Sequence, residues 1–185
     1  TDTMQITSPL DEATVARLRA GDRVLLSGIV YTARDAAHKR LVAALEKGER
    51  LPFDPAGQTI YYVGPSPAPP GRVVGSAGPT TSGRMDVYTP RLLAAGLRAM
   101  IGKGARSPEV REAMKKHRAV YLAATGGAGA LISRCIKKVE PVAYDDLGPE
   151  AILRLEVENL PAIVVNDIYG GDAYLEGKAR YQRLS

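Results

Sequence analysis

Short apolar runs alternate along this chain with helical segments that end at glycine, and this order constrains the fold most strongly. Residues 23–30 form an apolar run typical of a buried strand. A helix is expected over 34–47, where Gly48 ends it. The same order returns downstream, with strands expected at 58–63, 97–101 and 119–124 and helices at 90–96 and 107–117. Strands that alternate with helices predict an α/β fold with a mixed central sheet and flanking helices.

The ends of the chain and its later part contribute further segments. We expect an edge strand at 3–7, a helix at 11–20, strands at 136–144, 152–158 and 162–167, and a charged helix or tail at 175–185. Thr89 and Ser107, each before a proline, are expected to open the two later helices. The proline-rich stretch 64–71 is short enough to be a loop within the domain. We therefore expect residues 1–185 to form a single domain.

Composition excludes several classes of protein. No apolar run approaches the roughly 20 residues of a membrane span, and no secretory leader pattern is present, so we expect a cytoplasmic protein. Cys135 is the only cysteine, and it is expected to be a buried small hydrophobe without a role in metal binding. The net charge of +5 is dispersed, and its densest group, residues 115–118, ends an expected helix where cations complement the dipole. Nucleic-acid binding is therefore the weaker interpretation of the basic balance.

Residues 75–86 form a glycine-rich loop after the strand-like run 72–74. Glycine lets the backbone approach a ligand closely. Its second half, residues 80–86, carries three hydroxyls, one guanidinium and one carboxylate, on Thr80, Thr81, Ser82, Arg84 and Asp86. Hydroxyl and guanidinium donors suit a carboxylate or a phosphate, so this loop predicts a pocket for a small anion.

Further cations follow other expected strands. Arg34 lies at a strand-to-helix junction, where it either binds an anion or pairs with Asp35 at the surface. Lys103 lies between two glycines and is either a positive point in a site or an ordinary turn lysine. The turn at 125–129 either cradles an anion or packs tightly. Since such loops converge at one edge of an α/β sheet, we expect 31–35, 78–86, 102–104 and 125–129 to meet there.

Other catalytic patterns are missing from the sequence. It contains no Gly-x-Ser-x-Gly elbow, no P-loop and no dinucleotide-binding fingerprint. His38 is expected to be a packing or supporting residue, because no second ligand stands at metal-binding spacing. The chain offers cations and hydroxyls without an evident electrophile or redox centre, which is typical of half of an active site.

These segments resemble a known family. The run Gly78-Pro-Thr-Thr-Ser-Gly-Arg-Met-Asp86, with Arg34 and its neighbours 33–38 upstream and 102–104 downstream, is similar to the β subunit of iron–sulfur class I fumarase. The same module is the C-terminal domain of single-chain class I fumarases and the β subunit of L-tartrate dehydratase. The resemblance runs from about residue 9 to about residue 175 and includes later matches at 121–122, 126–127, 155–158 and 161–162.

The resemblance implies a swivelling β/β/α fold and a hydro-lyase of the tricarboxylic acid cycle, which reversibly hydrates fumarate to (S)-malate. An α subunit would carry the [4Fe–4S] cluster on three cysteines of its own, in a heterodimer or an α2β2 complex. Thr80 would transfer the proton, tuned by Arg84 and Asp86. The substrate would be held by Arg34, Thr81, Arg84, Lys103, Gly126 and Gly127.

Several alternatives stay open at this point. Thr81, next to Thr80, is a second candidate for the base. L(+)-Tartrate is a second candidate substrate, because both substrates are four-carbon dicarboxylates. A function of a different class is also possible for these residues: a non-catalytic module that binds dicarboxylates and needs no partner subunit. Self-association of the isolated chain is also left open.

Overall fold

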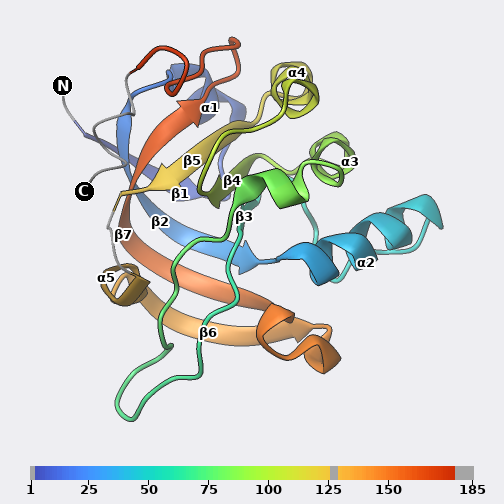
Figure 1. Ribbon diagram of the computed structural model, residues 1–185, viewed down its shortest axis with the longest axis vertical. Helices are drawn as coiled ribbons and strands as arrows, with labels where there is room; N and C mark the ends of the chain where they lie inside the picture. Colours follow the sequence, from blue (N-terminus) through green and yellow to red (C-terminus); the bar gives the residue numbers. More distant parts are fainter. Residues whose placement is uncertain (1–2, 126–128, 178–185) are drawn as a thin grey trace.

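The computed structural model describes residues 3–125 and 129–177, with the side chains of residues 130 and 131 left aside (Figure 1). Within these residues, one mixed sheet has the strand order β1-β2-β3-β4-β5-β7-β6. Its strands are β1 (Met4–Ser8), β2 (Arg23–Thr32), β3 (Thr59–Tyr61), β4 (Ala99–Gly102), β5 (Val120–Ala124), β6 (Ile136–Ala143) and β7 (Ile152–Asn166). The α/β class and the mixed sheet are thus confirmed, while the swivelling character of the fold stays a prediction.

The helices fill most connections between these strands. They are α1 (Glu12–Arg17), α2 (Asp35–Glu46), α3 (Thr89–Ala94), α4 (Pro108–His117) and α5 (Gly129–Ser133), with the 3-10 helices η1 (Ser82–Met85) and η2 (Asp145–Glu150). In the described part of the chain, each helix is too short or too polar to cross a bilayer. Residues 178–185, which belong to the expected charged tail, lie outside the described residues, and the single-domain organisation stays a prediction.

The sheet closes on itself through β7. Strands β1 to β5 pair in parallel, whereas β7 pairs antiparallel with β2, β5 and β6. Because β7 bonds to both β2 and β5, the pairings β2-β3-β4-β5-β7-β2 form a ring. The carboxyl ends of the parallel strands β2 to β5 therefore lie at one end of this ring, where the following loops meet.

Two apolar clusters fill the two faces of the sheet. One contains Leu26, Ile101 and Val164 and packs against Val15 of α1 and Ile132 of α5. The other contains strand residues of the opposite parity and side chains from α2, α3 and α4, including Leu41, Leu92 and Met114. Figure 1 shows α2, α3 and α4 together on one side of the sheet. Successive residues along a strand therefore belong to different clusters, as expected for a sheet that is covered on both faces.

The strand β7 differs from the sequence prediction of two strands at 152–158 and 162–167. It is continuous over Ile152–Asn166. Asn159 takes a positive φ of 53°, and its N–H donates to Ser27 Oγ at 3.0 Å. The chain therefore bends at Asn159 and keeps its pairing, because Asn tolerates the left-handed conformation.

Three local predictions were wrong. Residues 72–74 form no strand. Thr89 does not cap α3: Tyr88 holds the N-cap position, and the Thr89 hydroxyl donates to the Met85 carbonyl. Helix α1 stops at Arg17, short of the expected residue 20. The prediction for Ser107 is confirmed, since its Oγ accepts the Val110 N–H at the start of α4.

Candidate functional site

The glycine-rich loop is fastened to the carboxyl ends of β3 and β4 by backbone hydrogen bonds. The Thr80 N–H donates to the Tyr62 carbonyl at 2.7 Å, and the Lys103 N–H donates to the Thr80 carbonyl at 3.3 Å. The Ser82 N–H donates to the Lys103 carbonyl at 2.8 Å. Thr80 and Lys103 are therefore neighbours in space, as the sequence predicted for loops that follow parallel strands.

The start of α2 joins the same site. Arg84 Nη2 lies 2.9 Å from Asp35 Oδ2, which links η1 to the first turn of α2. Of the two interpretations of Arg34, pairing with Asp35 is therefore disfavoured, since Asp35 pairs with Arg84. The Arg34 Nε atom is buried without a hydrogen-bond partner among the described residues. The structure thus brings together the segments that carry Arg34, Thr80, Arg84 and Lys103.

Gly64 makes room for the Arg34 side chain. A methyl group at Gly64 would lie 3.2 Å from Arg34 Cδ and 2.9 Å from the Pro149 carbonyl oxygen. The backbone carbonyl cannot give way easily, so a larger residue would press against Arg34. On the other side, the carboxylate of Glu150 accepts the Ala36 N–H at 3.2 Å and satisfies the first turn of α2. The start of α2 therefore packs against two other segments, one at Gly64 and one that contains Pro149 and Glu150.

The candidate ligand-binding side chains differ in exposure. Thr80 is half-buried, whereas Thr81, Arg84 and Lys103 are exposed. Among the residues that the structure describes, the Thr80 hydroxyl makes no side-chain hydrogen bond, so it is free to meet a ligand. Exposed cations around a half-buried hydroxyl form an open, positively charged wall that can bind an anion.

The glycines of the 125–129 turn are described only in part. Gly126 and Gly127, expected to bind substrate, lie outside the described residues. At the end of the turn, the Ala77 N–H donates to the Gly129 carbonyl at 3.3 Å. A methyl group at Gly129 would lie 2.5 Å from the Gly78 nitrogen. Tight packing therefore explains Gly129, and the anion-binding role of the preceding glycines stays a prediction.

Asp86 is occupied by contacts beneath the site. One carboxylate oxygen lies 2.9 Å from Arg106 Nε, and the other accepts the Ser107 N–H at 2.9 Å. The Arg106 side chain is fully buried, donates to Thr89 Oγ1 at 2.9 Å, and lies over the ring of Tyr121. These contacts favour a supporting role in which Asp86 fixes the turn that carries Arg84 to the start of α4.

The sequence reasoning missed Arg106. Its only local signal is its place just before the Ser-Pro start of α4, and arginines are usually exposed. Nothing in the spacing connects it to Asp86, 20 residues earlier. The pairing becomes evident only when the loops after β3 and β4 are placed side by side.

A second set of contacts fixes the same two loops. Ser82 Oγ lies 2.5 Å from the Tyr121 hydroxyl, which donates to the Gly104 carbonyl at 2.8 Å. Because the Tyr121 proton is used in that bond, Ser82 is the donor to Tyr121. Gly102 lies directly against this pair: a methyl group there would be 2.0 Å from Ser82 Oγ. Gly102 is therefore required by packing as well as by its place beside Lys103.

His38 lies buried at the end of the first turn of α2. Its Nδ1 lies 2.9 Å from the Arg34 carbonyl oxygen, to which it donates in the neutral form. Its ring meets Tyr62 edge-on at 5.3 Å between centroids. Burial lowers the pKa of His38 to about 4, so the ring is neutral near pH 7. The expectation of a packing and supporting role agrees with these contacts.

The described residues do not fit an iron–sulfur cluster. Residues 3–125 and 129–177 contain no group of three or more His, Cys, Asp or Glu side chains that could hold a metal ion. Cys135 is half-buried rather than buried, and its thiol donates to the Asn159 carbonyl at 3.8 Å. Burial raises the pKa of this thiol, which disfavours the thiolate that ligates metals.

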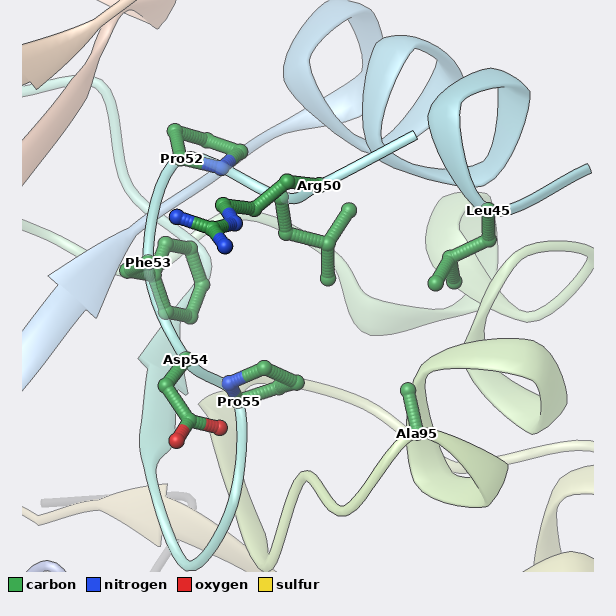
Figure 2. Close-up of a pocket in the computed structure, with 8 residues that line it drawn as sticks. Leu45, Arg50, Pro52, Phe53, Asp54, Pro55 and Ala95 are labelled. Atoms are coloured by element: carbon green, nitrogen blue, oxygen red, sulfur yellow. The ribbon is translucent and has the colours of Figure 1, made fainter. Parts of the chain in front are cut away.

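A separate hollow lies at the far end of α2. It has a volume of about 600 Å³ and is lined by Leu45, Arg50, Leu51, Pro52, Phe53, Asp54, Pro55 and Ala95. Figure 2 shows Arg50, Pro52 and Phe53 along one segment. Leu45 comes from α2, and Ala95 comes from the end of α3. None of the predicted site residues lines this hollow, and Arg34 lies at the opposite end of α2. The hollow is therefore distinct from the candidate site, which lies at the carboxyl ends of the parallel strands.

One protein family and several known proteins are similar to this chain. The family described as "Fumarase C-terminus" matches residues 1–177. The aerobic class I fumarate hydratase of Escherichia coli is 39% identical over 175 residues, which cover 92% of this chain and 32% of that protein. Fumarate hydratase 2 of Leishmania major is 39% identical over 170 residues, 90% of this chain and 30% of that protein.

One relative has nearly the same extent as this chain. The protein named "Putative L(+)-tartrate dehydratase subunit beta" of Methanocaldococcus jannaschii is 40% identical over 183 residues, 95% of this chain and 94% of that protein. By contrast, the chain spans about a third of the length of the fumarate hydratases above. The match over residues 1–177 covers the candidate site entirely. The chain therefore belongs to the fumarase C-terminus family.

Proposed function

We propose that this chain is the β subunit of a class I fumarate hydratase, which reversibly hydrates fumarate to (S)-malate at a site shared with an iron–sulfur α subunit. The observation that supports the proposal is that the segments carrying Arg34, Arg84 and Lys103 lie beside that of Thr80: the Lys103 N–H donates to the Thr80 carbonyl, and Arg84 pairs with Asp35. Membership of the family supports the same class of reaction, a hydro-lyase.

The cations suit a four-carbon dicarboxylate. Each arginine offers a planar fork of donors to one carboxylate, and Lys103 adds a compact charge. Arg34 and Arg84 come from different elements, α2 and η1, so they can approach the two ends of a short substrate from separate directions. Thr81 and the glycines Gly126 and Gly127 complete the proposed binding set. Such an arrangement selects a small dianion over a longer or neutral molecule.

Thr80 is the proposed proton-transfer residue. Hydration of fumarate adds a proton to one carbon of the double bond, and dehydration of malate removes it. A threonine hydroxyl is a very weak acid, so its alkoxide needs nearby positive charge to form. Arg84 and Lys103 supply that charge, and Thr80 is better shielded from water than the exposed Thr81.

The [4Fe–4S] cluster is proposed to reside on the partner. When bound there, it would act as a Lewis acid toward the substrate hydroxyl and carboxylate. The described residues of this chain do not offer its ligands, so their proposed work is confined to binding, orientation and proton transfer. The cytoplasmic location and the copy number of each subunit stay predictions.

Tartrate is the second candidate substrate. The observation that favours it is the match across 94% of a protein named as a tartrate dehydratase β subunit, compared with 32% of the E. coli fumarate hydratase. Both substrates have carboxylates at the ends of a four-carbon chain, so the same cations would serve either. The extra hydroxyl of tartrate would be distinguished by groups outside the cationic set described here.

The experiment uses the assembled complex. The chain is co-expressed with a cluster-bearing α subunit, purified without oxygen and assayed with fumarate, (S)-malate and L(+)-tartrate. The proposal predicts fumarate hydration by the complex and none by either subunit alone. Tartrate dehydration with no fumarate hydration would transfer the assignment to the second substrate. Tight malate binding by the isolated chain, with no activity in any combination, would favour the binding-module alternative.

A further inference from the structure

Asp35, the first residue of α2, forms an ion pair with a residue that is distant in the sequence. Its Oδ2 atom lies 2.9 Å from Arg84 Nη2, although the two residues are 49 positions apart. Its Oδ1 atom is buried and has no hydrogen-bond partner among the described residues. The side chain is 31% exposed, compared with 65% for Asp146, which pairs with Arg40 further along α2. Asp35 is therefore held closer to the protein interior than an ordinary surface partner.

The pair joins two loops that both carry proposed substrate-binding residues. Asp35 directly follows Arg34 and begins α2, while Arg84 lies within η1. A carboxylate in the first turn of a helix is favoured by the helix dipole, so Asp35 is a stable anchor. Arg84 is 56% exposed and would otherwise sample many rotamers. The ion pair restricts it before any ligand arrives.

The contact leaves Arg84 able to bind. A guanidinium has five N–H donors on three nitrogens, and the contact to Asp35 is made by Nη2.

We propose that Asp35 is a positioning residue, which orients Arg84 toward one substrate carboxylate. This inference rests on the proposed function, because it requires that Arg84 binds the substrate. Pre-orientation reduces the entropy that binding must remove, and one immobilised arginine corresponds to about a three- to tenfold change in affinity. Asp35 is expected to act through Arg84 and to make no contact with the substrate itself.

The test is a double-mutant cycle on the assembled complex, with Asp35→Ala, Arg84→Ala and the combined variant. Succinate, an unreactive four-carbon dicarboxylate, is the probe, and its dissociation constant is measured by calorimetry. Asp35→Ala is expected to weaken succinate binding about three- to tenfold when Arg84 is present, and to have no effect in the Arg84→Ala background. Equal effects in both backgrounds, or unchanged binding in the single variant, would overturn the inference.

Two further variants make the result specific. Asp146→Ala breaks the Arg40 pair on α2 away from the site and is expected to leave succinate binding unchanged. Asp35→Asn keeps an acceptor oxygen of the same shape and is expected to give a loss smaller than that of Asp35→Ala. If Asp35→Ala does not fold, Asp35→Asn replaces it in the cycle, and wild-type affinity in that variant would refute the role.

The experiments distinguish a failure of the positioning role of Asp35 from a failure of the proposed function. If Arg84→Ala leaves fumarate turnover and succinate binding unchanged, the proposed binding set is wrong and Asp35 loses its role with it. If Arg84→Ala weakens binding and Asp35→Ala does not, the proposed function survives and only the positioning role fails. KM measured with fumarate should rise with the succinate dissociation constant, whereas a purely structural role would lower the melting temperature without changing KM.

Discussion

Thr80 and Thr81 are adjacent in the sequence but occupy different environments. Thr80 is half-buried and is held by its backbone to Tyr62 and Lys103, whereas the side chain of Thr81 is exposed. A proton-transfer residue works best where water is limited and its position is fixed. The difference in burial, which the sequence alone does not contain, supports our proposal of Thr80 as the proton-transfer residue.

The first prediction follows from this difference. Thr80→Ala is expected to lower kcat by about 10²- to 10⁴-fold with a small change in KM, because proton transfer acts in the transition state. Thr81→Ala is expected to change KM more than kcat. Steady-state kinetics of the assembled complex with fumarate measure both. The reverse pattern would assign the base to Thr81.

The buried His38 is expected to make the folded protein less stable at acidic pH. Its pKa in the folded state is about 4, below the usual 6.5, because burial disfavours the charged ring. Below pH 6.5 the unfolded chain binds this proton and the folded chain does not, so stability falls between about pH 6.5 and pH 4. The full loss from this one group is about 3 kcal/mol. Urea unfolding at pH 7 and pH 4.5 measures it.

The matched variants for this experiment are His38→Gln and His117→Gln. His38→Gln should flatten the acid-side decline in unfolding free energy, whatever its stability at pH 7. His117 is only partly buried at the end of α4, and its replacement should leave the decline in place. A decline that is equally steep in wild type and His38→Gln would mean that other groups cause it.

Removal of the Asp86 carboxylate is expected to lower the free energy of unfolding strongly. Asp86→Ala would leave the fully buried Arg106 without its carboxylate partner, which typically costs about 3–5 kcal/mol. Asp146→Ala removes an exposed pair and is expected to cost about 1 kcal/mol or less. Chemical denaturation of both variants gives the comparison. Similar small losses would show that the Arg106–Asp86 pair is not a main support of the turn.

At the scale of elements, the site depends on how closely β4 approaches the glycine-rich loop. Gly102 ends β4, and a methyl group there would be 2.7 Å from Tyr62 Cδ2 and still closer to Ser82. The Ser82–Tyr121 and Tyr121–Gly104 hydrogen bonds pass beside the same position. The loop and the strand are therefore packed directly against each other, next to Lys103.

A pair of glycine variants tests this coupling. Gly102→Ala is expected to destabilise the fold by about 1–3 kcal/mol and to raise KM, because the loop must shift. Gly83→Ala lies in the same loop with no atom within 4 Å of the added methyl group, and it is expected to change stability by about 0.5 kcal/mol or less. Thermal unfolding and fumarate kinetics check both variants. Equal behaviour would contradict the packing argument.

The sequence predicted the elements whose signals are local. The apolar run of β2, the glycine after α2 and the Ser-Pro start of α4 all gave elements close to their observed bounds. The continuity of β7 was missed, because Asn159 and Pro161 usually interrupt strands. What keeps β7 continuous is pairing with β2, β5 and β6, which lie far away in the sequence.

The candidate site was predictable to the extent that parallel strands end together. That rule alone predicts that Arg34, Thr80 and Lys103 lie near one another. The Asp35–Arg84 and Asp86–Arg106 pairs were not predictable, since each depends on the relative placement of loops from different parts of the chain. Long-range electrostatic contacts of this kind leave no periodic pattern in a sequence.

At the scale of the whole molecule, the chain presents an open, positively charged end of its sheet. Arg84 and Lys103 are exposed there, and the described residues contain no metal-binding group. The chain spans about a third of the length of the E. coli fumarate hydratase and nearly all of the protein named "Putative L(+)-tartrate dehydratase subunit beta". Our proposal is that a second polypeptide completes the open site.

The most direct test is fumarate hydration measured without oxygen for this chain alone, for a cluster-loaded α subunit alone and for their mixture. The account predicts (S)-malate formation only in the mixture, and a strong loss when Arg34, Arg84 or Lys103 of this chain is replaced by alanine. Malate formation by the isolated chain would contradict the account. Full activity in each of the three mixtures, made with one alanine variant apiece, would also contradict it.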